Sequence, residues 1–566
     1  MGAGWERDAV EVVREPWCGG EVLSYRPRPR DVLDVLDLAV RRDPDAVAVV
    51  DARDGTTRTA HRLALDVVAT ARAWATAGLQ PGDGVGIAAA NSGDHLVALL
   101  ACAATGAVAV GLSPRLAVDQ WRYQLTRSRC RWLLHEPDDD THATLARDAV
   151  RDLPGVRRVP ALGSVGDPRT EDWQRFQATR TPARPEQAYQ VVYTSGTTGR
   201  PKASQVVHRA SVHSGLAYDR LLRLAPGEST GVLFSLGYIS AMHAHVLPAL
   251  LSGARLVMLP TGSPRTWVEQ LAAFDVAWAY AVPSWWLLAL REPGLAASAL
   301  PRLRLAGAGG SPFPDRLRDG LAERLPRTEL LNVYGLSETH SPATVLRGRE
   351  LWEHPGAAGR PLEVVEVTTR DEDGRVLPDG EAGEVWLRSS LVTTGYADDA
   401  GATAAAVRAG AFRTGDVGVV RRDGAGPVLT LLDRVKDMVN RAGTKVFAAE
   451  VERVLDAHPA VAESACVAVP DDRAGETVAV VLVARGDDPD DGRDDGPDDG
   501  RAIRALTRPS DAELRAWVRA RLGDAAAPSV VRWVDALPRG GTGKTDKSAL
   551  RAALRGAPPA GGTLEA

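Results

Sequence analysis

The chain has 566 residues, which is too many for one compact core and predicts at least two domains. Hydrophobic residues make up 44% of it and charged residues 25%, as in ordinary globular proteins, and a net charge of −5 gives no reason to expect a nucleic-acid partner. The cysteines form no CxxC pair, and the start MGAGWERDAV has no basic stretch followed by an apolar run. This favours a cytoplasmic protein without a zinc site, disulfide framework or signal peptide.

The first three quarters of the chain predict a large domain of layered α/β subdomains. Residues 30–435 alternate short apolar runs with amphipathic stretches, and helices are expected at His95–Thr105 and Pro314–Arg324. The uncharged stretch Leu96–Ser113 is interpreted as a helix, a stop at Gly106 and a buried strand, and not as a membrane span. Further strands are expected over 84–90, 190–194, 254–259 and 303–309, and turn-punctuated strands after Gly359 indicate a small β-rich subdomain.

A second, smaller α+β domain is expected at the carboxyl end. The domain boundary is predicted near Lys436, which gives a large domain over 1–435 and a small mobile domain over 436–566. A helix is expected over 448–458 and strands over 461–470 and 477–484. Within it, residues 487–499 hold eight Asp, and their spacing matches no EF-hand, so a solvated, disordered acidic insertion is expected near 486–510.

The segment from Thr194 to Lys202 carries the strongest chemical signal. An apolar run leads into Thr194-Ser195-Gly196-Thr197-Thr198-Gly199, and Lys202 follows. Glycines let a backbone approach a phosphate closely, hydroxyls and amides donate hydrogen bonds to its oxygens, and a lysine adds positive charge. The spacing is not that of a Walker A loop. Alone, the segment predicts either another kind of phosphate loop or an ordinary polar turn.

This loop resembles the phosphate loop of the adenylate-forming superfamily, which comprises acyl-CoA synthetases, adenylation domains and luciferases. Two more elements of that family follow in order: Gly309-Gly310-Ser311 resembles its adenine-side turn, and Asn332 to Thr339 (NVYGLSET) resembles its YGxTE element. The resemblance implies that Asn332, Tyr334 and Gly335 bind the nucleotide, with Tyr334 stacked on adenine. It also implies that Glu338 serves Mg²⁺ and that Thr339 contacts the α-phosphate.

Carboxyl-terminal motifs extend the resemblance over about residues 30–550. Asp416 and Arg434 match the family's ribose contacts, and Lys436 falls on its hinge. Arg441-Ala442-Gly443 corresponds to a turn that lines the thioester-forming tunnel, although the family usually has glycine at the position of Ala442. Pro538 to Lys544 resembles the catalytic-lysine loop, which implies that Lys544 bridges the carboxylate of the acid and the α-phosphate.

Lysine is rare in this chain, and its positions are informative. Of the 68 basic residues only five are lysine, and all lie in or beside these motifs: Lys202, Lys436, Lys445, Lys544 and Lys547. Arginine cannot replace lysine where a compact, rotatable point charge is needed. We therefore expect Lys202 and Lys544 to be required as lysines.

The pocket for the acid is implied by family position. Tyr238 takes the place of an aromatic gate, and only one of the adjacent Trp285 and Trp286 can face a shared pocket. Aromatic and small apolar residues favour a hydrophobic acid, with room for a bulky one, over acetate or an amino acid. His243 and His245 lack carboxylate or cysteine partners and are expected to be packing or polar-contact residues. The other candidate lining residues are Ala241, Met242, Gly307 and Ala308.

The leading hypothesis is an acyl-CoA synthetase that uses ATP, Mg²⁺ and coenzyme A to activate a small-molecule carboxylic acid as its acyl-adenylate. One alternative keeps the fold but transfers the acyl group to a carrier protein or catalyses a single half-reaction. Another, of a different class, is a nucleotide-binding protein without catalysis, and the presence of Glu338 and Lys544 argues against it. No feature of the sequence indicates the oligomeric state.

Overall fold

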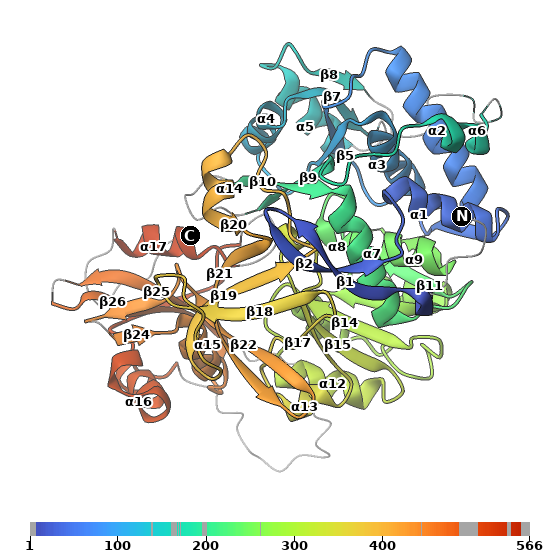
Figure 1. Ribbon diagram of the computed structural model, residues 1–566. Helices are drawn as coiled ribbons and strands as arrows, with labels where there is room; N and C mark the ends of the chain where they lie inside the picture. The colour runs from blue at the N-terminus through green and yellow to red at the C-terminus, as the bar shows by residue number, and fades with distance from the viewer. Residues whose placement is uncertain are drawn as a thin grey trace. The chain divides into compact units, whose positions relative to one another are not determined.

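The computed structural model describes residues 7–136, 140–159, 167, 169, 171–194, 201–260, 262–442, 444–471, 473–485, 508–539 and 545–555. The chain forms two compact units: unit 1 comprises Met1–Thr414 and Val419–Thr430, and unit 2 comprises Gly415–Gly418 and Leu431–Ala566. Each unit mixes helices and strands, which confirms the predicted α/β class with a large amino-terminal and a small carboxyl-terminal part (Figure 1). No helix in the described ranges is long and apolar enough to cross a membrane.

Unit 1 contains a six-stranded sheet in the order β10-β9-β6-β5-β7-β8, in which β10 runs antiparallel to β9 and the other neighbours are parallel. Helix α3 (Gly93–Thr105) ends at Gly106, whose φ of 74° is left-handed, and β6 follows, which confirms the predicted helix, glycine stop and strand. The strands are β5 (Gly84–Ala88), β6 (Val108–Gly111), β7 (Cys130–His135), β8 (Arg157–Val159), β9 (Ala188–Thr194) and β10 (Lys202–Val207). The helices in this part of the chain are α2 (Ala60–Thr76), α4 (Val118–Arg127), α5 (Asp140–Val150) and α6 (Trp173–Thr179).

A second, nine-stranded sheet of unit 1 has the order β17-β16-β15-β14-β13-β11-β12-β3-β4. Its central strands are parallel, and every residue of β13 and β14 is buried, as expected for parallel strands covered on both faces. Their carboxyl ends therefore meet at one edge, where ligands bind in open α/β sheets. The strands are β3 (Val47–Asp51), β4 (Thr57–Thr59), β11 (Ser229–Val232), β12 (Arg255–Met258), β13 (Val276–Ala281), β14 (Leu305–Gly309), β15 (Glu329–Tyr334), β16 (Thr344–Arg347) and β17 (Arg360–Pro361).

Helices of different lengths accompany this sheet. Short turns such as η4 (Ser337–Thr339) follow strand ends, and a π-helical turn (Met242–Val246) continues α8. Trp267, Val268, Leu271, Trp286, Leu317 and Leu321 join strand residues in one buried cluster. The helices are α7 (His208–Leu222), α8 (Ile239–Ala241), α9 (Leu247–Ser252), α10 (Pro264–Ala273), α11 (Pro283–Ala289), α12 (Asp315–Arg324) and α13 (Glu350–Glu353).

Smaller β elements complete unit 1, as the turn-punctuated pattern after Gly359 predicts. Two long strands, β21 (Ala411–Asp423) and β22 (Gly426–Arg434), contribute residues to both units. The other elements are β18 (Val365–Arg370), β19 (Ala382–Ser389), β20 (Val407–Arg408), α14 (Ala400–Ala406) and the amino-terminal hairpin of β1 (Glu11–Trp17) and β2 (Gly20–Arg26).

Unit 2 is built on a five-stranded sheet with its own core. The order is β24-β23-β26-β25, with β27 beside β26, and α15 packs Val451 and Leu455 against Cys466 and Val480. The acidic insertion predicted near 486–510 falls largely on 486–507, outside the described residues. The elements are β23 (Val439–Arg441), β24 (Thr444–Val446), α15 (Ala448–Asp456), β25 (Val461–Asp471), β26 (Gly475–Ala484), α16 (Asp511–Leu522), β27 (Val530–Val534) and α17 (Lys547–Arg555).

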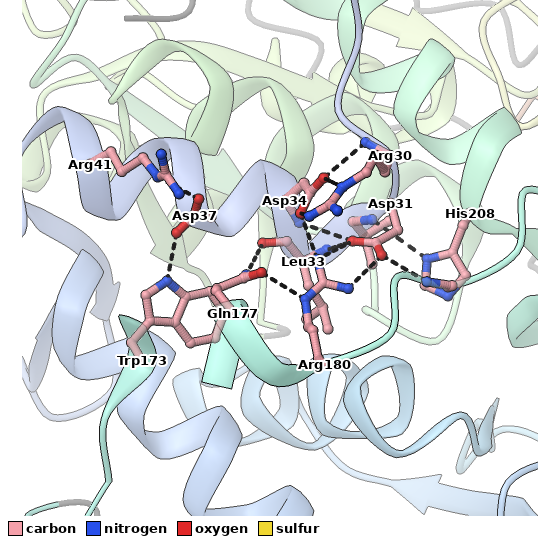
Figure 2. A network of polar contacts seen from close by, with 12 residues as sticks. Arg30, Asp31, Leu33, Asp34, Asp37, Arg41, Trp173, Gln177, Arg180 and His208 are labelled. Carbon is pink, nitrogen blue, oxygen red and sulfur yellow. Dashed lines mark hydrogen bonds and ion pairs between the residues drawn. The ribbon is translucent and has the colours of Figure 1, made fainter. Parts of the chain in front are cut away.

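A buried ion cluster fastens helix α1 (Val32–Arg42) to distant parts of unit 1 (Figure 2). Arg180 Nη1 donates to Asp31 Oδ2 at 2.6 Å, and Arg180 Nη2 donates to Asp34 Oδ1 at 2.6 Å. Asp31 also caps α1, because it accepts from the backbone N–H groups of Leu33 and Asp34. Burial alone would raise the pKa of Asp31, but the hydrogen bonds and charge of Arg180 outweigh it and hold this pKa below its ordinary value. The cluster therefore stabilises the fold in its ionised form.

Arg180→Met is expected to lower the free energy of unfolding of unit 1 by about 3–5 kcal/mol, because it leaves the Asp31 carboxylate buried and unpaired. Denaturant titration followed by tryptophan fluorescence measures this change. Since the pKa of Asp31 is depressed, the contribution is present above about pH 4 and is lost as the pH falls through the lowered value. Arg265→Met, which breaks an exposed pair with Glu269, is the matched control and should cost less than about 1 kcal/mol. Equal losses in the two variants would contradict the prediction.

Candidate functional site

The two ends of the predicted phosphate loop lie side by side. Thr194 closes β9 and Lys202 opens β10, and the two residues are partners in the antiparallel register. Tyr123 Oη donates to the carbonyl oxygen of Pro201 at 3.0 Å and so fixes the exit from the loop. The residues between these ends lie outside the described ranges, and their contacts with phosphate stay predictions: Ser195, Gly196, Thr197, Thr198 and Gly199.

The carboxylate of Glu338 lies against one end of this loop. Its Oε1 accepts hydrogen bonds from Thr194 Oγ1 and from Tyr396 Oη, both at 3.0 Å. The N–H of Thr393 donates to the backbone carbonyl of Glu338 at 2.7 Å, which holds the main chain in place. Among the described residues none donates to Oε2. The carboxylate is therefore oriented through one oxygen, and the other is left for a ligand.

This arrangement fits an Mg²⁺ ion that takes most of its ligands from phosphates. Mg²⁺ is usually bound by one or two carboxylates together with substrate phosphates and water. The described part of the chain contains no group of three or more His, Cys, Asp or Glu that could hold a metal without such help. A single oriented carboxylate with one open oxygen, on Glu338, is the donor set that a shared site requires.

Tyr396 is a component of this site that the sequence analysis missed. Lys202 Nζ lies 5.0 Å from the centroid of its ring, within the range of a cation–π contact. Burial raises the pKa of Tyr396, and the neighbouring Glu338 carboxylate raises it further, so the hydroxyl stays protonated and acts as a donor. Its only signal in the sequence was a tyrosine, one of nine in the chain, after the hydroxyl-rich run Thr393-Thr394-Gly395.

Hydrogen bonds of the Thr339 and His340 side chains fix the turn that carries Glu338. Thr339 Oγ1 accepts from the N–H of Leu336 at 3.1 Å and lies 3.2 Å from its carbonyl oxygen, so it closes the turn. His340 adopts a left-handed φ of 50°, and its ring contacts the N–H of Val207 at 3.1 Å and the carbonyl of Leu391 at 2.9 Å. The predicted contact of Thr339 with an α-phosphate stays a prediction.

The predicted adenine-side residues lie at the carboxyl ends of two adjacent strands. Gly309 ends β14 and is the register partner of Val333 in β15, which ends at Tyr334. Gly310 follows with a left-handed φ of 84°, a conformation that glycine adopts at little cost. The amide of Asn332 donates to the carbonyl of Ala357 at 3.1 Å and so faces the protein interior. Ser311 is exposed, and Gly335 packs against the 341–343 backbone.

The residues predicted for the acid's pocket have different environments. Trp286 is fully buried, and its indole N–H donates to the carbonyl of Gly307 at 2.8 Å, so it belongs to the core. Trp285 is half-buried and packs edge-on against Trp267. The two tryptophans therefore differ in environment, as expected for adjacent helical residues. Tyr238 is half-buried, whereas Ala241, Met242 and Ala308 are fully buried.

His243 and His245 are hydrogen-bonded core residues, as expected. His243 contacts the carbonyl of Ile239 at 2.7 Å and the hydroxyl of Ser211 at 3.0 Å. His245 contacts Thr230 Oγ1 at 2.6 Å. Burial lowers the pKa of His243 to about 4 and that of His245 to about 3, so both rings are neutral at physiological pH.

In unit 2, the structure brings together the two predicted ribose contacts. Arg434 Nε lies 3.0 Å from Asp416 Oδ1, and the Asp416 side chain is 7% exposed. Burial lowers the pKa of Lys436, the predicted hinge residue. Its carbonyl accepts from Arg551 Nη2 at 3.3 Å, and this arginine also pairs with Asp437. The hinge segment is therefore tied to helix α17.

The remaining predicted residues of unit 2 surround a turn after β23. The guanidinium of Arg441 donates to the carbonyls of Asp524, Ala525 and Ala527 at 3.0–3.2 Å, so it fastens the turn to the body of the unit. Ala442 has a left-handed φ of 50°, which costs an L-residue about 1–2 kcal/mol relative to right-handed backbone. This explains why glycine is the favoured residue here. Gly443 and Lys544 lie outside the described residues.

Comparison with known proteins places these residues in a family context. A family model for the AMP-binding enzyme matches residues 36–397, and one for the AMP-binding enzyme C-terminal domain matches residues 450–544. A feruloyl-CoA synthase from Amycolatopsis sp is 31% identical over 514 residues, which covers 90% of this chain and 96% of that protein. A 4-chlorobenzoate–CoA ligase from Arthrobacter sp is 29% identical over 476 residues, 80% of this chain and 86% of that protein.

Solved structures resemble the chain over nearly its whole length. The amide bond synthetase McbA from Marinactinospora thermotolerans superimposes with a TM-score of 0.75 at 29% identity and covers 92% of this chain and 99% of its own. The fold and the order of the two units are thus those of a known enzyme architecture.

Tyr396→Phe is expected to weaken Mg²⁺-dependent binding of ATP by about tenfold, because a hydrogen bond to a charged group contributes roughly 1.5–3 kcal/mol. Calorimetric titration with ATP in Mg²⁺ and in EDTA measures the effect, and the loss should be confined to the Mg²⁺ arm. Tyr189→Phe removes a buried hydroxyl bonded to Ser211 and serves as the matched control. An equal loss in both arms would mean that Tyr396 does not act through the metal-facing carboxylate.

Proposed function

This chain belongs to the AMP-binding enzyme family, and we propose that it activates a hydrophobic carboxylic acid as its acyl-adenylate and transfers the acyl group to coenzyme A. The family match and the names of the related ligases confirm the prediction of an adenylate-forming ligase. The observation that carries the proposal is the convergence of Thr194, Lys202 and Glu338 at the mouth of the predicted phosphate loop.

In the first half-reaction, a carboxylate oxygen of the acid attacks the α-phosphorus of ATP and pyrophosphate leaves. Lys202, held beside Thr194, places a positive charge at the loop where the phosphates would lie, and Lys544 would supply a second at the attacking carboxylate. Orienting two anions for in-line attack can itself contribute roughly 7–11 kcal/mol. Thr194 and Tyr396 hold the Glu338 carboxylate ready for the cation. When bound there, Mg²⁺ neutralises charge that develops on the phosphate oxygens.

In the second half-reaction, the thiolate of coenzyme A attacks the acyl carbonyl and AMP leaves, so that a thioester bond replaces the mixed anhydride. Lys436 is proposed as the hinge that allows unit 2 to present a different face for this step. The contacts of Arg551 with the Lys436 carbonyl and with Asp437 support a hinge that moves together with α17.

The acid is proposed to be hydrophobic and aromatic. The predicted pocket residues Tyr238, Met242 and Gly307 are apolar or aromatic, and no basic residue lies among them. The names of two relatives, a feruloyl-CoA synthase and a 4-chlorobenzoate–CoA ligase, also denote aryl acids.

The four cysteines are unpaired in the structure, which supports a reducing, cytoplasmic setting for the reaction.

A second acceptor is a specific alternative to coenzyme A. Ala442 places a methyl group on a strained turn that is proposed to line the acceptor tunnel. The structurally similar McbA is named as an amide bond synthetase. Transfer to a carrier protein or another nucleophile, or catalysis of adenylation alone, is therefore the competing assignment. A protein without catalysis is disfavoured, because two donors orient Glu338 through one oxygen and no described residue donates to the other.

Lys544→Ala is expected to abolish acid-dependent exchange of pyrophosphate into ATP, because it removes the charge proposed at the attacking carboxylate. Exchange assayed over a panel of aryl and alkyl acids measures this. Lys544→Arg should recover only a small fraction of the activity, since a planar guanidinium cannot replace a compact ammonium. If no acid supports exchange by the wild-type enzyme, the adenylation assignment fails.

Coenzyme A is expected to be consumed when the enzyme is given a synthetic acyl-adenylate, and Lys544→Ala should retain this activity within about threefold because the step does not use that lysine. Free thiol titration and mass measurement of the thioester report the reaction. Release of free acid or transfer only to an added amine or carrier protein would instead support the alternative acceptor.

A further inference from the structure

The side chain of Tyr280 occupies the edge of the sheet at which the acid is proposed to bind. Tyr280 is the penultimate residue of β13 and the register partner of Gly307 in β14. A Cβ added at Gly309 would lie 2.2 Å from Tyr280 Oη, and one added at Gly307 would lie 2.8 Å from Tyr280 Cδ2. Because these approaches leave no space for a side chain, the two glycines accommodate the tyrosine ring across β14.

Other aromatic rings surround Tyr280 and fix its position. The Phe234 ring centroid lies 5.4 Å away, and that of Trp278 lies 5.7 Å away in a stacked arrangement. The ring of His245 lies at 6.3 Å. Tyr280 therefore contacts Phe234, which is four residues before the predicted gate Tyr238, and it pairs with Gly307, a predicted pocket residue of β14. Its ring is held by packing on several sides, and its hydroxyl has little freedom of position.

The hydroxyl of Tyr280 is a buried polar group without a hydrogen-bond partner among the described residues. The hydroxyls of two other buried tyrosines do have partners: Tyr189 bonds to Ser211 at 3.0 Å and Tyr218 to Ser341 at 3.1 Å. Tyr280 is 5% exposed, and its unpaired oxygen is not fully enclosed. His245 Nε2, by contrast, is fully enclosed and lacks a partner in the described part of the chain. A ligand at the sheet edge can therefore reach it.

Burial raises the pKa of Tyr280 well above its ordinary value, and the neighbouring Tyr218 adds to the shift. The hydroxyl is therefore neutral over the whole physiological range, and it can donate one hydrogen bond and accept others. A neutral donor and acceptor in an aromatic surrounding is suited to a hydroxyl, ether or carbonyl oxygen and not to an ion.

We propose that Tyr280 determines the acid specificity of this enzyme, and that its hydroxyl hydrogen-bonds an oxygen carried on the carbon skeleton of an aromatic acid. The inference rests on the proposed adenylation function and names the substrate class more closely: an oxygenated aryl acid in preference to its plain hydrocarbon analogue. The two kinds of acid differ in what they do to the free energy of the Tyr280 hydroxyl. An acid without the oxygen would cover the Tyr280 hydroxyl and leave it unpaired, whereas a matching oxygen satisfies it.

The size of the expected preference follows from one neutral hydrogen bond. Leaving a single buried polar group unpaired corresponds to roughly 10-fold to 100-fold in kcat/KM. Tyr280→Phe removes the unpaired group with little change in shape. It should therefore lower kcat/KM for the oxygenated acid and raise it for the plain acid.

The experiment compares matched acids in wild-type and Tyr280→Phe enzymes. The probes are the 2-, 3- and 4-hydroxycinnamic acids with cinnamic acid, and the corresponding hydroxybenzoic acids with benzoic acid, assayed by pyrophosphate exchange. At least one hydroxylated acid should exceed its plain analogue by about tenfold or more in the wild type, and Tyr280→Phe should reduce that ratio at least about fivefold. Tyr189→Phe, which also loses a buried hydroxyl, should leave the ratio unchanged.

The outcomes separate this inference from the function on which it rests. Exchange with equal rates for hydroxylated and plain acids, or a ratio unchanged by Tyr280→Phe, overturns the role of Tyr280 and leaves adenylation intact. If no acid supports exchange, the adenylation assignment fails, and calorimetric binding of the same acid pairs to both variants still decides whether Tyr280 discriminates between them. A thermal melt of Tyr280→Phe within about 3 °C of the wild type excludes a general loss of packing as the cause.

Discussion

A side-chain hydrogen bond between Thr194 and Glu338 joins the two main sheets of unit 1 at the site. Thr194 ends β9 in the six-stranded sheet, and Glu338 lies just beyond β15 in the nine-stranded sheet. Their contact spans 144 residues of sequence and fixes the carboxylate beside the entrance to the phosphate loop. Since no described residue donates to the other Glu338 oxygen, this bond both links the two sheets and leaves a ligand position. The remaining features of the site, including the Lys202 charge and the Tyr396 ring, are arranged around this junction.

Much of the fold could be predicted because its signals are local. Buried parallel strands are recognisable in the sequence as continuous apolar runs. Gly106 ends a helix in a left-handed conformation that residues with a side chain disfavour. The phosphate loop, the Glu338 element and the lysine loop could be found for a similar reason, because each is a contiguous stretch of unusual residues. The order of these three motifs along the chain then indicated that they belong to one site. This inference did not require the distance between any two residues.

The parts that the sequence did not reveal depend on contacts between distant segments. Tyr396 reaches Glu338 across 58 positions, and nothing around it marks it as different from a packing tyrosine. Trp285 and Trp286 are adjacent and chemically identical, yet one is enclosed in the core and the other is only half-buried, because the helix turns them to different sides. Gly307 was predicted to line the acid's pocket, and Gly309 was assigned to the adenine-side turn. In the fold the rings of Trp278 and Tyr280 fill the space beside these two glycines, so the small residues serve the packing of the protein itself.

The distribution of basic residues gains a physical explanation from the structure. Arginines such as Arg180 and Arg441 each satisfy several acceptors at once, as a rigid fork of donors allows. Lys202 instead meets the face of one ring beside a loop for phosphates, and Lys547 Nζ lies 2.8 Å from the single carboxylate of Glu452. Among the described residues, Lys202 contacts the face of one ring, and Lys547 forms an ion pair with one carboxylate while the charges of Asp437 and Asp433 also act on it. A guanidinium would bring a wider, planar set of donors to either position, so lysine is favoured where the charge must be compact and free to turn toward a ligand or a carboxylate.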